Sequence, residues 1–435
     1  MAFKCVANFF IKILFKGELR KRIKNKCLGK FDEYKRCVKQ ERHYNKVLIN
    51  LRKKVERKEK VRVGFLVIFD SVFSARSLYE EMLSNDFFDP FIVVMPDVAR
   101  SEMLQTFNDS YESLSKQYSD VRKGYDPLTG NFTDFSDDMD MAYFDNPYDC
   151  MAHEFFSINY LRKKDILLFY INYGYMLTKY SRTVFALQEY SYFWRIFIET
   201  ESILEDLKKY QIINGKNAVV TGYCKMDYLA GEKIEQRTRK TIILAPHHSI
   251  VPNTLIFLSE FLRYSDFFLE LPNLYPDINF VFKPHPLLFK TLRKDEFWGT
   301  EKVDNYLSKL KSFDNVIYRG TGPYFDLFAN SDAIIHDCGS FLAEYLFTER
   351  PACYMLKNVE QIEAMLGDTG QKCLENCYHA FNENDILHFI NDIVIKGNDS
   401  LKDERIKFMN DVLKINYPNV GKTILEYLIK VLRHD

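Results

Sequence analysis

The sequence has no uncharged apolar run of 18 or more residues in its 435 positions, so no segment is predicted to span a bilayer. A secretory signal peptide is not predicted either, because the first residues lack a long apolar core and a small-residue cleavage site. The nine cysteines are odd in number and form no CxxC pairs, which is typical of a reduced, cytoplasmic protein without a zinc site.

Several familiar catalytic motifs are missing as well. There is no GxxxxGK[ST], no GxGxxG after the first apolar run, no GxSxG and no HExxH. The sequence therefore has no motif that favours a P-loop NTPase, a dinucleotide oxidoreductase, an α/β-hydrolase or a zinc protease. The composition, with 47% hydrophobic residues, excludes a disordered chain. Group transfer from an activated phosphate donor is the chemistry that is left.

The charge of the chain is unevenly distributed, although 60 Lys and Arg balance 60 Asp and Glu. Residues 1–62 hold 21 basic and 6 acidic side chains, a balance of +15, so residues 63–435 carry −15. Residues 3–16 mix apolar side chains with lysines, and further basic residues follow at Arg20, Lys21, Arg22, Lys24, Lys26 and Lys30. This pattern favours a basic amphipathic helical arm, residues 1–60, on the anionic inner face of the cell membrane, with a solvated helical arm as the alternative. Nothing in the arm resembles a nucleic-acid-binding module, so nucleic acid is not a predicted partner.

Short apolar runs rich in Val, Ile and Phe recur between longer amphipathic stretches. They are Val61–Phe69, Phe91–Met95, Ile166–Ile171, Ala218–Thr221, Thr241–Leu244, Ile278–Phe282, Val316–Tyr318, Ala333–Ile335 and Ala352–Leu356. Runs that are apolar on both faces are typical of parallel strands covered by helices on each side. The predicted fold class is therefore α/β.

The length and the alternation of strands and helices predict two doubly wound, Rossmann-like domains that face a cleft. We place an N-terminal domain at residues 61–235 and a C-terminal domain at residues 236–400. Helices at residues 401–435 are expected to pack back on the cleft side. Residues 190–209 are predicted to be helical. The acidic residues 120–149 lack EF-hand spacing and are predicted to form a solvated loop.

Three of the predicted strands end in unusual polar residues. These are His247, His248 and Ser249 after the first strand, Lys283 and His285 after the second, and His336, Asp337, Gly339 and Ser340 after the third. A single histidine at a strand end more often caps the sheet. Histidines at several strand ends instead indicate a site, because imidazole gives and takes protons near neutral pH.

The third of these loops is also suited to an anion. Gly339 and Ser340 lie at a predicted helix start, where free backbone N–H groups and the helix dipole attract phosphate. Ser340 on its own has an ordinary alternative role as an N-cap. Lys283 and His285 on the neighbouring strand end add positive charge and hydrogen bonds, which favours a phosphate or pyrophosphate ligand.

Five sequence blocks together resemble the CDP-glycerol glycerophosphotransferase family, the teichoic-acid primases and polymerases. The blocks are Thr221-Gly222-Tyr223-Cys224-Lys225-Met226-Asp227, Leu244-Ala245-Pro246, Lys283-Pro284-His285-Pro286, Ser331-Asp332-Ala333-Ile334-Ile335-His336-Asp337-Cys338-Gly339-Ser340 and Arg350-Pro351-Ala352. They match that family's "TGxPRxD", "YAPT", "HP", "ITDYSS" and "KP" blocks in order and approximate spacing. The resemblance covers residues 218–356 well and the first domain only weakly.

The resemblance implies a GT-B fold, a CDP-activated donor held mainly by the C-terminal domain, and peripheral attachment to the inner face of the cell membrane. His285 matches the functional histidine of the "HP" block. Asp337 and Ser340 match donor-contacting residues, and Glu344 lies where GT-B enzymes often bind ribose hydroxyls. The candidate donor-binding residues are therefore Lys283, Asp337, Gly339, Ser340, Glu344, Ser249 and His336.

The sequence departs from the family in the first domain. The family's "WHGTPLK" block carries a histidine thought to act as the base, and its nearest counterpart here, residues 170–177, has no histidine. Either His247 or His248 then serves as the base, or the donor and acceptor differ from those of the family. The candidate catalytic residues are His285, His247 and His248. Tyr173 and Tyr175 are candidates for the acceptor side, with a role in the core as the alternative.

These features predict a transferase that moves an alditol phosphate from a CDP-activated donor to a hydroxyl of a lipid-linked or polymeric acceptor, in teichoic-acid or capsule synthesis. The enzymatic alternative is a GT-B glycosyltransferase that uses a nucleotide sugar for capsule or lipopolysaccharide assembly. A membrane-bound scaffold with a degenerate cleft is the non-enzymatic alternative. No metal-ligand set is assigned and no cofactor is required, although a divalent metal stays possible.

Overall fold

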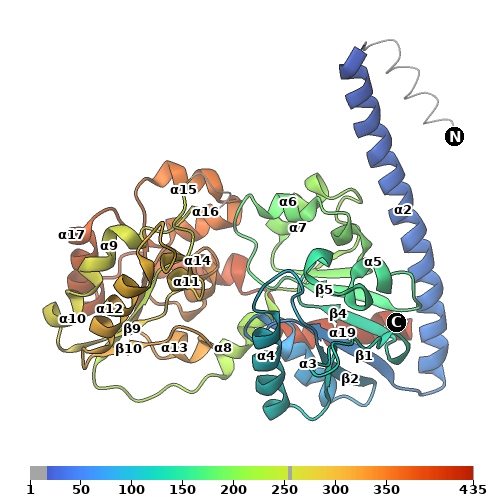
Figure 1. Cartoon of the computed structure of the whole chain (residues 1–435), viewed down its shortest axis with the longest axis horizontal. Helices are drawn as coiled ribbons and strands as arrows, with labels where there is room; N and C mark the ends of the chain where they lie inside the picture. The colour runs from blue at the N-terminus through green and yellow to red at the C-terminus, as the bar shows by residue number, and fades with distance from the viewer. Residues whose placement is uncertain (1–16, 253–256, 435) are drawn as a thin grey trace.

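The computed structural model describes residues 17–252 and 257–434, which form two parallel β-sheets, each covered by helices (Figure 1). The strand order is β3-β2-β1-β4-β5-β6-β7 in the first sheet and β10-β9-β8-β11-β12-β13 in the second. The strands of the first sheet are β1 (Val61–Val67), β2 (Phe88–Val94), β3 (Val121–Lys123), β4 (Met141–Phe144), β5 (Leu167–Ile171), β6 (Arg195–Ile198) and β7 (Ala218–Val220). Those of the second are β8 (Lys240–Ala245), β9 (Ile278–Phe282), β10 (Val316–Tyr318), β11 (Ala333–His336), β12 (Ala352–Met355) and β13 (Tyr378–Ala380).

Helices connect the strands and cover the sheets. Those before the second sheet are α2 (Gly17–Glu56), α3 (Arg76–Leu83), α4 (Met103–Gln117), α5 (Ile158–Leu161), α6 (Ser181–Phe185), α7 (Glu201–Tyr210) and α8 (Asp227–Gly231). The later ones are α9 (Phe261–Phe268), α10 (Leu271–Leu274), α11 (Leu288–Leu292), α12 (Gly299–Lys311), α13 (Phe325–Ala329), α14 (Phe341–Glu344), α15 (Val359–Met365), α16 (Asp368–Glu375), α17 (Glu383–His388), α18 (Lys402–Phe408) and α19 (Val420–Arg433). Among the described residues, no helix combines the length and the apolar character needed to cross a membrane.

The strand residues are apolar on both faces because both faces are covered. Every residue of β4 and β5 is buried, as are most residues of β1 and β8. Each of the nine apolar runs in the sequence overlaps a strand of one of the two sheets. The prediction of an α/β fold with parallel sheets is therefore confirmed.

Two sequence predictions about the first sheet are wrong. The acidic segment expected to be a loop contains β4, which pairs with β1 and β5 at the centre of the sheet. The stretch expected to be helical from 190 to 209 contains β6, which pairs with β5 and β7. Each strand has only four residues, too few to show a periodicity, and acidic or helical neighbours dominate the surrounding sequence.

The N-terminal arm is helical in its described part. α2 has 40 residues, which corresponds to about 60 Å of helix at about 1.5 Å per residue. Its later turns join the core of the first half through buried side chains such as Cys37, Val47 and Leu51, and the Tyr44 hydroxyl donates to the Tyr192 carbonyl at 2.7 Å. Figure 1 shows its first turns extending beyond the rest of the molecule. The amphipathic segment 3–16 lies outside the described residues, and membrane contact stays a prediction.

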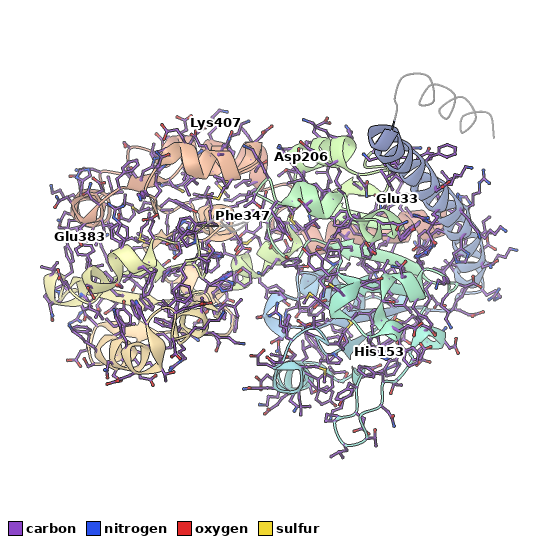
Figure 2. All side chains as sticks on the ribbon, turned by 45° about the horizontal axis from the view of Figure 1, so that its top comes forward. Glu33, His153, Asp206, Phe347, Glu383 and Lys407 are labelled. Carbon is purple, nitrogen blue, oxygen red and sulfur yellow. The ribbon has the colours of Figure 1, made fainter. Side chains whose placement is uncertain are left out.

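The chain crosses from the second half back to the first near its end. Met409 and Leu413 belong to a core of the second half, whereas Val420, Ile424 and Leu428 of α19 belong to the core of the first. At the crossing, the ring of Phe347, labelled near the junction of the halves in Figure 2, lies edge-on to Tyr417 at 5.2 Å. The helical segment predicted at 401–435 is thus divided between both halves.

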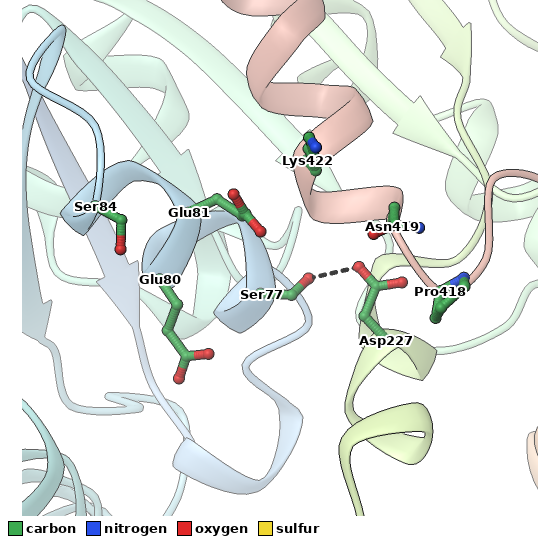
Figure 3. A pocket seen from close by; sticks show the side chains of 8 residues that line it. All are labelled: Ser77, Glu80, Glu81, Ser84, Asp227, Pro418, Asn419 and Lys422. Atoms are coloured by element: carbon green, nitrogen blue, oxygen red, sulfur yellow. Dashed lines mark hydrogen bonds between the residues drawn. The ribbon is translucent and has the colours of Figure 1, made fainter.

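Asp227 holds the start of α19 against the first half. Its carboxylate accepts hydrogen bonds from the backbone N–H groups of Val420 at 3.1 Å and Gly421 at 2.8 Å, and from the Ser77 hydroxyl at 3.0 Å (Figure 3). A carboxylate at a helix N-terminus satisfies unpaired donors and interacts favourably with the helix dipole. The last residue of the "TGxPRxD"-like block therefore has a structural role here.

The backbone conformation at position 222, in the same block, requires glycine. It has a φ of 95°, and a Cβ atom there would lie 2.0 Å from the Ile415 carbonyl oxygen. Because only glycine adopts this conformation without strain and leaves room for that carbonyl, Gly222 permits the returning chain to pass beside β7.

Gly421 offers a test of the contact between α3 and α19. In Gly421→Ala the new Cβ would lie 2.5 Å from the Ser77 oxygen and 2.7 Å from the Leu78 nitrogen, so we expect a loss of about 1–3 kcal/mol of stability and a lower Tm. Gly231→Ala is the matched control, since no atom lies within 4 Å of its Cβ position, and it should change stability by no more than about 0.5 kcal/mol. Equal melting temperatures for the two variants would contradict this packing.

Candidate functional site

Three histidines from two loops meet at the carboxyl edge of the second sheet. His247 and His248 follow β8, and His285 follows β9, its neighbour in the sheet. The ring centroids are separated by 4.4 Å for His247 and His248, 4.1 Å for His248 and His285, and 5.1 Å for His247 and His285. We call these three rings the imidazole cluster. The prediction that histidines at these strand ends converge is confirmed for these three residues.

Hydrogen bonds fix the tautomer of two rings in the cluster. His285 Nδ1 accepts from the backbone N–H of Leu287 at 3.1 Å, and His247 Nδ1 accepts from the backbone N–H of Ser249 at 3.3 Å. Because a backbone N–H is always a donor, neither Nδ1 carries a proton. The proton of each neutral ring is therefore on Nε2, which makes Nε2 a hydrogen-bond donor.

The cluster is uncharged at neutral pH. Burial lowers the pKa of His285 to about 3, with contributions from the charges of His248 and Lys283. Burial also lowers the pKa of His248, and that of His247 well below its ordinary value, where His248 and His285 contribute. Neutral imidazoles that expose N–H groups stabilise an anion without the cost of burying further positive charge.

Lys283 supplies a cation beside the cluster. It lies at the end of β9, is 5% exposed, and donates its backbone N–H to the Leu244 carbonyl at 2.8 Å. Burial lowers the pKa of Lys283 to about 8, so its ammonium group remains mostly protonated at pH 7. The predicted pairing of Lys283 with His285 on one strand end is therefore present.

The same cluster has the residue types of a metal centre, since one ligand atom from each ring lies within 4.8 Å of the other two. Its hydrogen bonds do not suit a metal. A histidine that binds metal through Nε2 donates its Nδ1–H to an acceptor, whereas the Nδ1 atoms of His247 and His285 face backbone N–H donors. The donor set fits an anion better than a cation, and the prediction of no metal requirement stays a prediction.

Asp337 does not face the ligand side of the loops. It is completely buried, and its Oδ1 accepts from the His247 backbone N–H at 2.5 Å. Its Oδ2 accepts from the backbone N–H of Glu260 at 2.7 Å and the hydroxyl of Ser259 at 3.3 Å. The prediction that Asp337 contacts the donor is therefore wrong for this structure, because both carboxylate oxygens are used to join the loops.

Ser249 and His336 are also positioning or packing residues. The Ser249 hydroxyl accepts from the Leu258 N–H at 3.0 Å and lies 2.7 Å from His247 Nδ1, so it orients the His247 ring. His336 is completely buried at the end of β11, with its ring 5.0 Å from that of Tyr354. The Ser249 hydroxyl is thus used by the protein, whereas His336 Nε2 has no hydrogen-bond partner among the described residues. The donor contact of these two residues stays a prediction.

Glu344 joins the two halves of the molecule. It is completely buried, and its carboxylate accepts from the Tyr223 hydroxyl at 3.1 Å and the Tyr324 hydroxyl at 2.5 Å, with Lys225 Nζ at 3.8 Å. Tyr223 and Lys225 precede the second sheet in the sequence, whereas Tyr324 lies between its strands β10 and β11, directly before α13. The predicted ribose contact of Glu344 is not available in this structure, because both oxygens already accept hydrogen bonds from the protein.

Gly339 and Ser340 remain candidates for the donor side. Ser340 precedes α14 but forms no side-chain capping hydrogen bond, so the alternative of a simple N-cap is wrong. Its hydroxyl lies 3.9 Å from the Cys338 sulfur and is otherwise available. At Gly339 a Cβ would meet only Leu258, at 3.4 Å, so the protein itself does not require glycine there.

The two candidate tyrosines of the acceptor side differ in position. Tyr175 is 5% exposed and packs in a core of the second half, with its ring 5.0 Å from Tyr223. The core alternative is therefore confirmed for Tyr175. Tyr173 is half-buried, with its hydroxyl 3.5 Å from that of Tyr148, and its acceptor role stays a prediction.

The sequence reasoning missed a buried polar network in the first half. Glu199 follows β6 and accepts from the Asn172 amide at 2.8 Å, and Asn172 accepts from the Tyr190 hydroxyl at 2.6 Å. Burial raises the pKa of Glu199 to about 7. The sequence pattern did not reveal this network, because the residues around Glu199 were predicted to form a helix.

A cavity of about 270 Å³ lies between the halves, beside the candidate donor loop. Its lining includes Thr178, Thr183, Leu258 and Met365, and Leu258 is the residue nearest to Gly339. The backbone N–H of Lys179 donates to the Met365 carbonyl at 2.8 Å, which connects the two halves at the wall of the cavity.

No protein-family model matches the chain, and neither does any curated protein. Among solved structures, the wall teichoic acid polymerase TagF is 14% identical, with a TM-score of 0.57 over 94% of this chain and 98% of TagF. The UDP-GlcNAc 2-epimerase of Neisseria meningitidis, bound to UDP-GlcNAc, is 16% identical, with a TM-score of 0.53 over 85% of this chain and 100% of that chain. MnaA of S. aureus with UDP is 13% identical, with a TM-score of 0.50 over 86% and 97% of the two chains. These likenesses show a common GT-B fold, which confirms the predicted fold and its resemblance to teichoic-acid polymerases at that level.

The buried histidines predict that stability falls in mild acid. Burial lowers the pKa of His336 to about 3, so between about pH 6.5 and 3 the unfolded chain binds a proton that the folded chain excludes. In His336→Asn the amide oxygen still accepts from the Cys338 N–H but does not titrate. Relative to its own stability at pH 7, this variant should lose less than wild type at pH 5, by about 2 kcal/mol. Calorimetry at both pH values measures this, with the exposed His388→Asn as a control that follows wild type. An unchanged pH dependence for His336→Asn would contradict the burial of that ring.

Proposed function

We propose that this protein is a transferase that moves an alditol phosphate, such as glycerol phosphate, from a CDP-activated donor to a hydroxyl acceptor during synthesis of a cell-surface polymer. The observation that carries the proposal is the imidazole cluster with Lys283 at the carboxyl edge of the second sheet. In doubly wound sheets this edge is the usual ligand site. Four of the five blocks that resemble the glycerophosphotransferase family lie in the same half, and TagF shares the fold.

The cluster is suited to a diphosphate. His247 and His285 present Nε2–H groups, and Lys283 presents an ammonium group from the same strand ends. Preorganised donors that face developing negative charge stabilise a transition state by about 3–4 kcal/mol each. Ser340, with its free hydroxyl, and the backbone of Gly339 are the remaining proposed donor contacts.

The proposed reaction is a displacement at the β-phosphorus of the donor. The acceptor hydroxyl oxygen forms a bond to that phosphorus, and the bond from the phosphorus to the bridging oxygen breaks. CMP leaves with the electron pair of that bond, and an imidazole takes the proton of the hydroxyl. The hydrogen-bond donors of the cluster and Lys283 stabilise the charge that gathers on the phosphate oxygens.

A second candidate is a glycosyltransferase that uses a nucleotide sugar. It is favoured by the fold shared with the two epimerase structures, one bound to UDP-GlcNAc and the other to UDP. In that reaction the acceptor attacks the anomeric carbon, so the product carries no new phosphate. The cluster would then bind the diphosphate of the leaving nucleotide.

We propose further that the basic arm attaches the protein to an anionic membrane surface, where a lipid-linked acceptor is available. The excess of positive charge in residues 1–62 supports this proposal, because each basic residue near such a surface contributes about 1 kcal/mol.

A donor panel tests the proposed function. The protein is incubated with CDP-glycerol, CDP-ribitol and several UDP-sugars, together with an acceptor polymer, and released nucleotides are identified by mass spectrometry. We expect CMP from a CDP-alditol. Release of UDP alone would support the glycosyltransferase, and no release from any donor would overturn both.

His285→Asn tests the role of the cluster. Its amide oxygen preserves the hydrogen bond from Leu287 but removes the Nε2–H group, so we expect kcat/KM to fall about 100-fold or more. His388→Asn, which changes an exposed histidine on α17, should retain wild-type activity. Wild-type turnover by His285→Asn would remove this ring from the mechanism.

A further inference from the structure

The three rings of the imidazole cluster are not equivalent. His247 and His285 each receive a backbone N–H on Nδ1, whereas among the described residues no hydrogen bond to a ring nitrogen of His248 is present. The backbone of His248 is nevertheless held, since its carbonyl accepts from the Ile250 N–H at 2.9 Å. The described residues therefore place its ring through the backbone and do not commit it to either tautomer.

We infer that His248 is the catalytic base of the proposed transfer, and that His247 and His285 serve only as hydrogen-bond donors. The inference rests on the proposed function and assigns separate roles within its site. His247 and His285 are unsuited to take a proton, because Nε2 already carries one and Nδ1 faces a backbone N–H. His248 has a ring nitrogen with a free lone pair in either tautomer.

The position of His248 agrees with this role. Its ring lies 4.4 Å from His247 and 4.1 Å from His285, closer to each than they are to one another. An oxygen of the donor bound by the two Nε2–H groups is then adjacent to His248. His248 is also half-exposed, whereas His247 is 9% exposed, so an acceptor hydroxyl can approach His248 from the solvent side.

The surroundings of His248 keep its ring neutral, so that it can accept a proton. The ionisable groups whose rings contact it are His247 on its own loop and His285 on the loop after β9. Burial lowers the pKa of His248, so the ring is neutral at pH 7. The negative charge of a bound diphosphate then favours the imidazolium that forms as the hydroxyl attacks.

The carboxylates of Asp337 and Glu199 are buried away from solvent, although Glu199 Oε1 has no hydrogen-bond partner among the described residues. Asp337 accepts three hydrogen bonds and is completely buried, and Glu199 of the first half is 1% exposed and accepts from Asn172. The first-domain block in which the family carries its histidine has none here. In this chain the inferred base, His248, therefore lies in the second half and not in the first.

Separate measurements of donor binding and turnover test the assignment. In His248→Gln, calorimetry with CDP-glycerol should give a Kd within about threefold of wild type, while single-turnover transfer falls about 10²- to 10⁴-fold. His285→Asn should instead weaken CDP-glycerol binding at least tenfold. His248→Gln that retains more than a tenth of wild-type turnover, or that loses binding as His285→Asn does, would overturn the assignment.

Rescue by free imidazole provides an independent readout. In His248→Ala, added imidazole should restore turnover at least tenfold, with a pH dependence that follows the added base, and His285→Ala should show no such rescue. Absence of rescue in His248→Ala, with a Tm equal to that of wild type, would also overturn the assignment. If wild type turns over only UDP-sugars, the CDP-alditol proposal fails, and the same variants decide the role of His248 on that donor.

Discussion

The geometry of the site depends on one buried carboxylate, Asp337. It accepts hydrogen bonds from His247, Ser259 and Glu260, so it joins the loop after β8, the start of α9 and the end of β11. A buried carboxylate is stable only when such donors surround it, and each donor is in turn costly to leave unpaired. The three segments are therefore held together, and the backbone of His247 is fixed by a buried carboxylate from the neighbouring strand end.

The sequence predicted the fold class and the strand edge that bears the site, because both depend on local patterns. Buried parallel strands such as β1 and β9 are continuous apolar runs, and polar residues at their ends are visible without a structure. The strands β4 and β6 were missed because four residues among acidic or helical neighbours show no period. Their burial is decided by pairing with strands that lie far away in the sequence.

The roles of individual polar residues were less predictable than their location. The same edge of the sheet carries His247, His285, Asp337 and His336. Of these four residues, only His247 and His285 belong to the imidazole cluster. Which of them faces a ligand depends on hydrogen bonds between loops that are 77 to 90 residues apart, such as those of Asp337. Glu344 was likewise expected at the ligand but is paired with Tyr223 across the two halves.

The long helix α2 sets the distance between its first residue and the core of the first half. About 20 residues separate its beginning at Gly17 from Cys37, and its later turns are anchored in the core of the first half through Tyr44. A stretch of that length spans about 30 Å and resists bending, so it acts as a rigid spacer. The start of this helix at Gly17 is thereby kept at a set distance from the core of the first half.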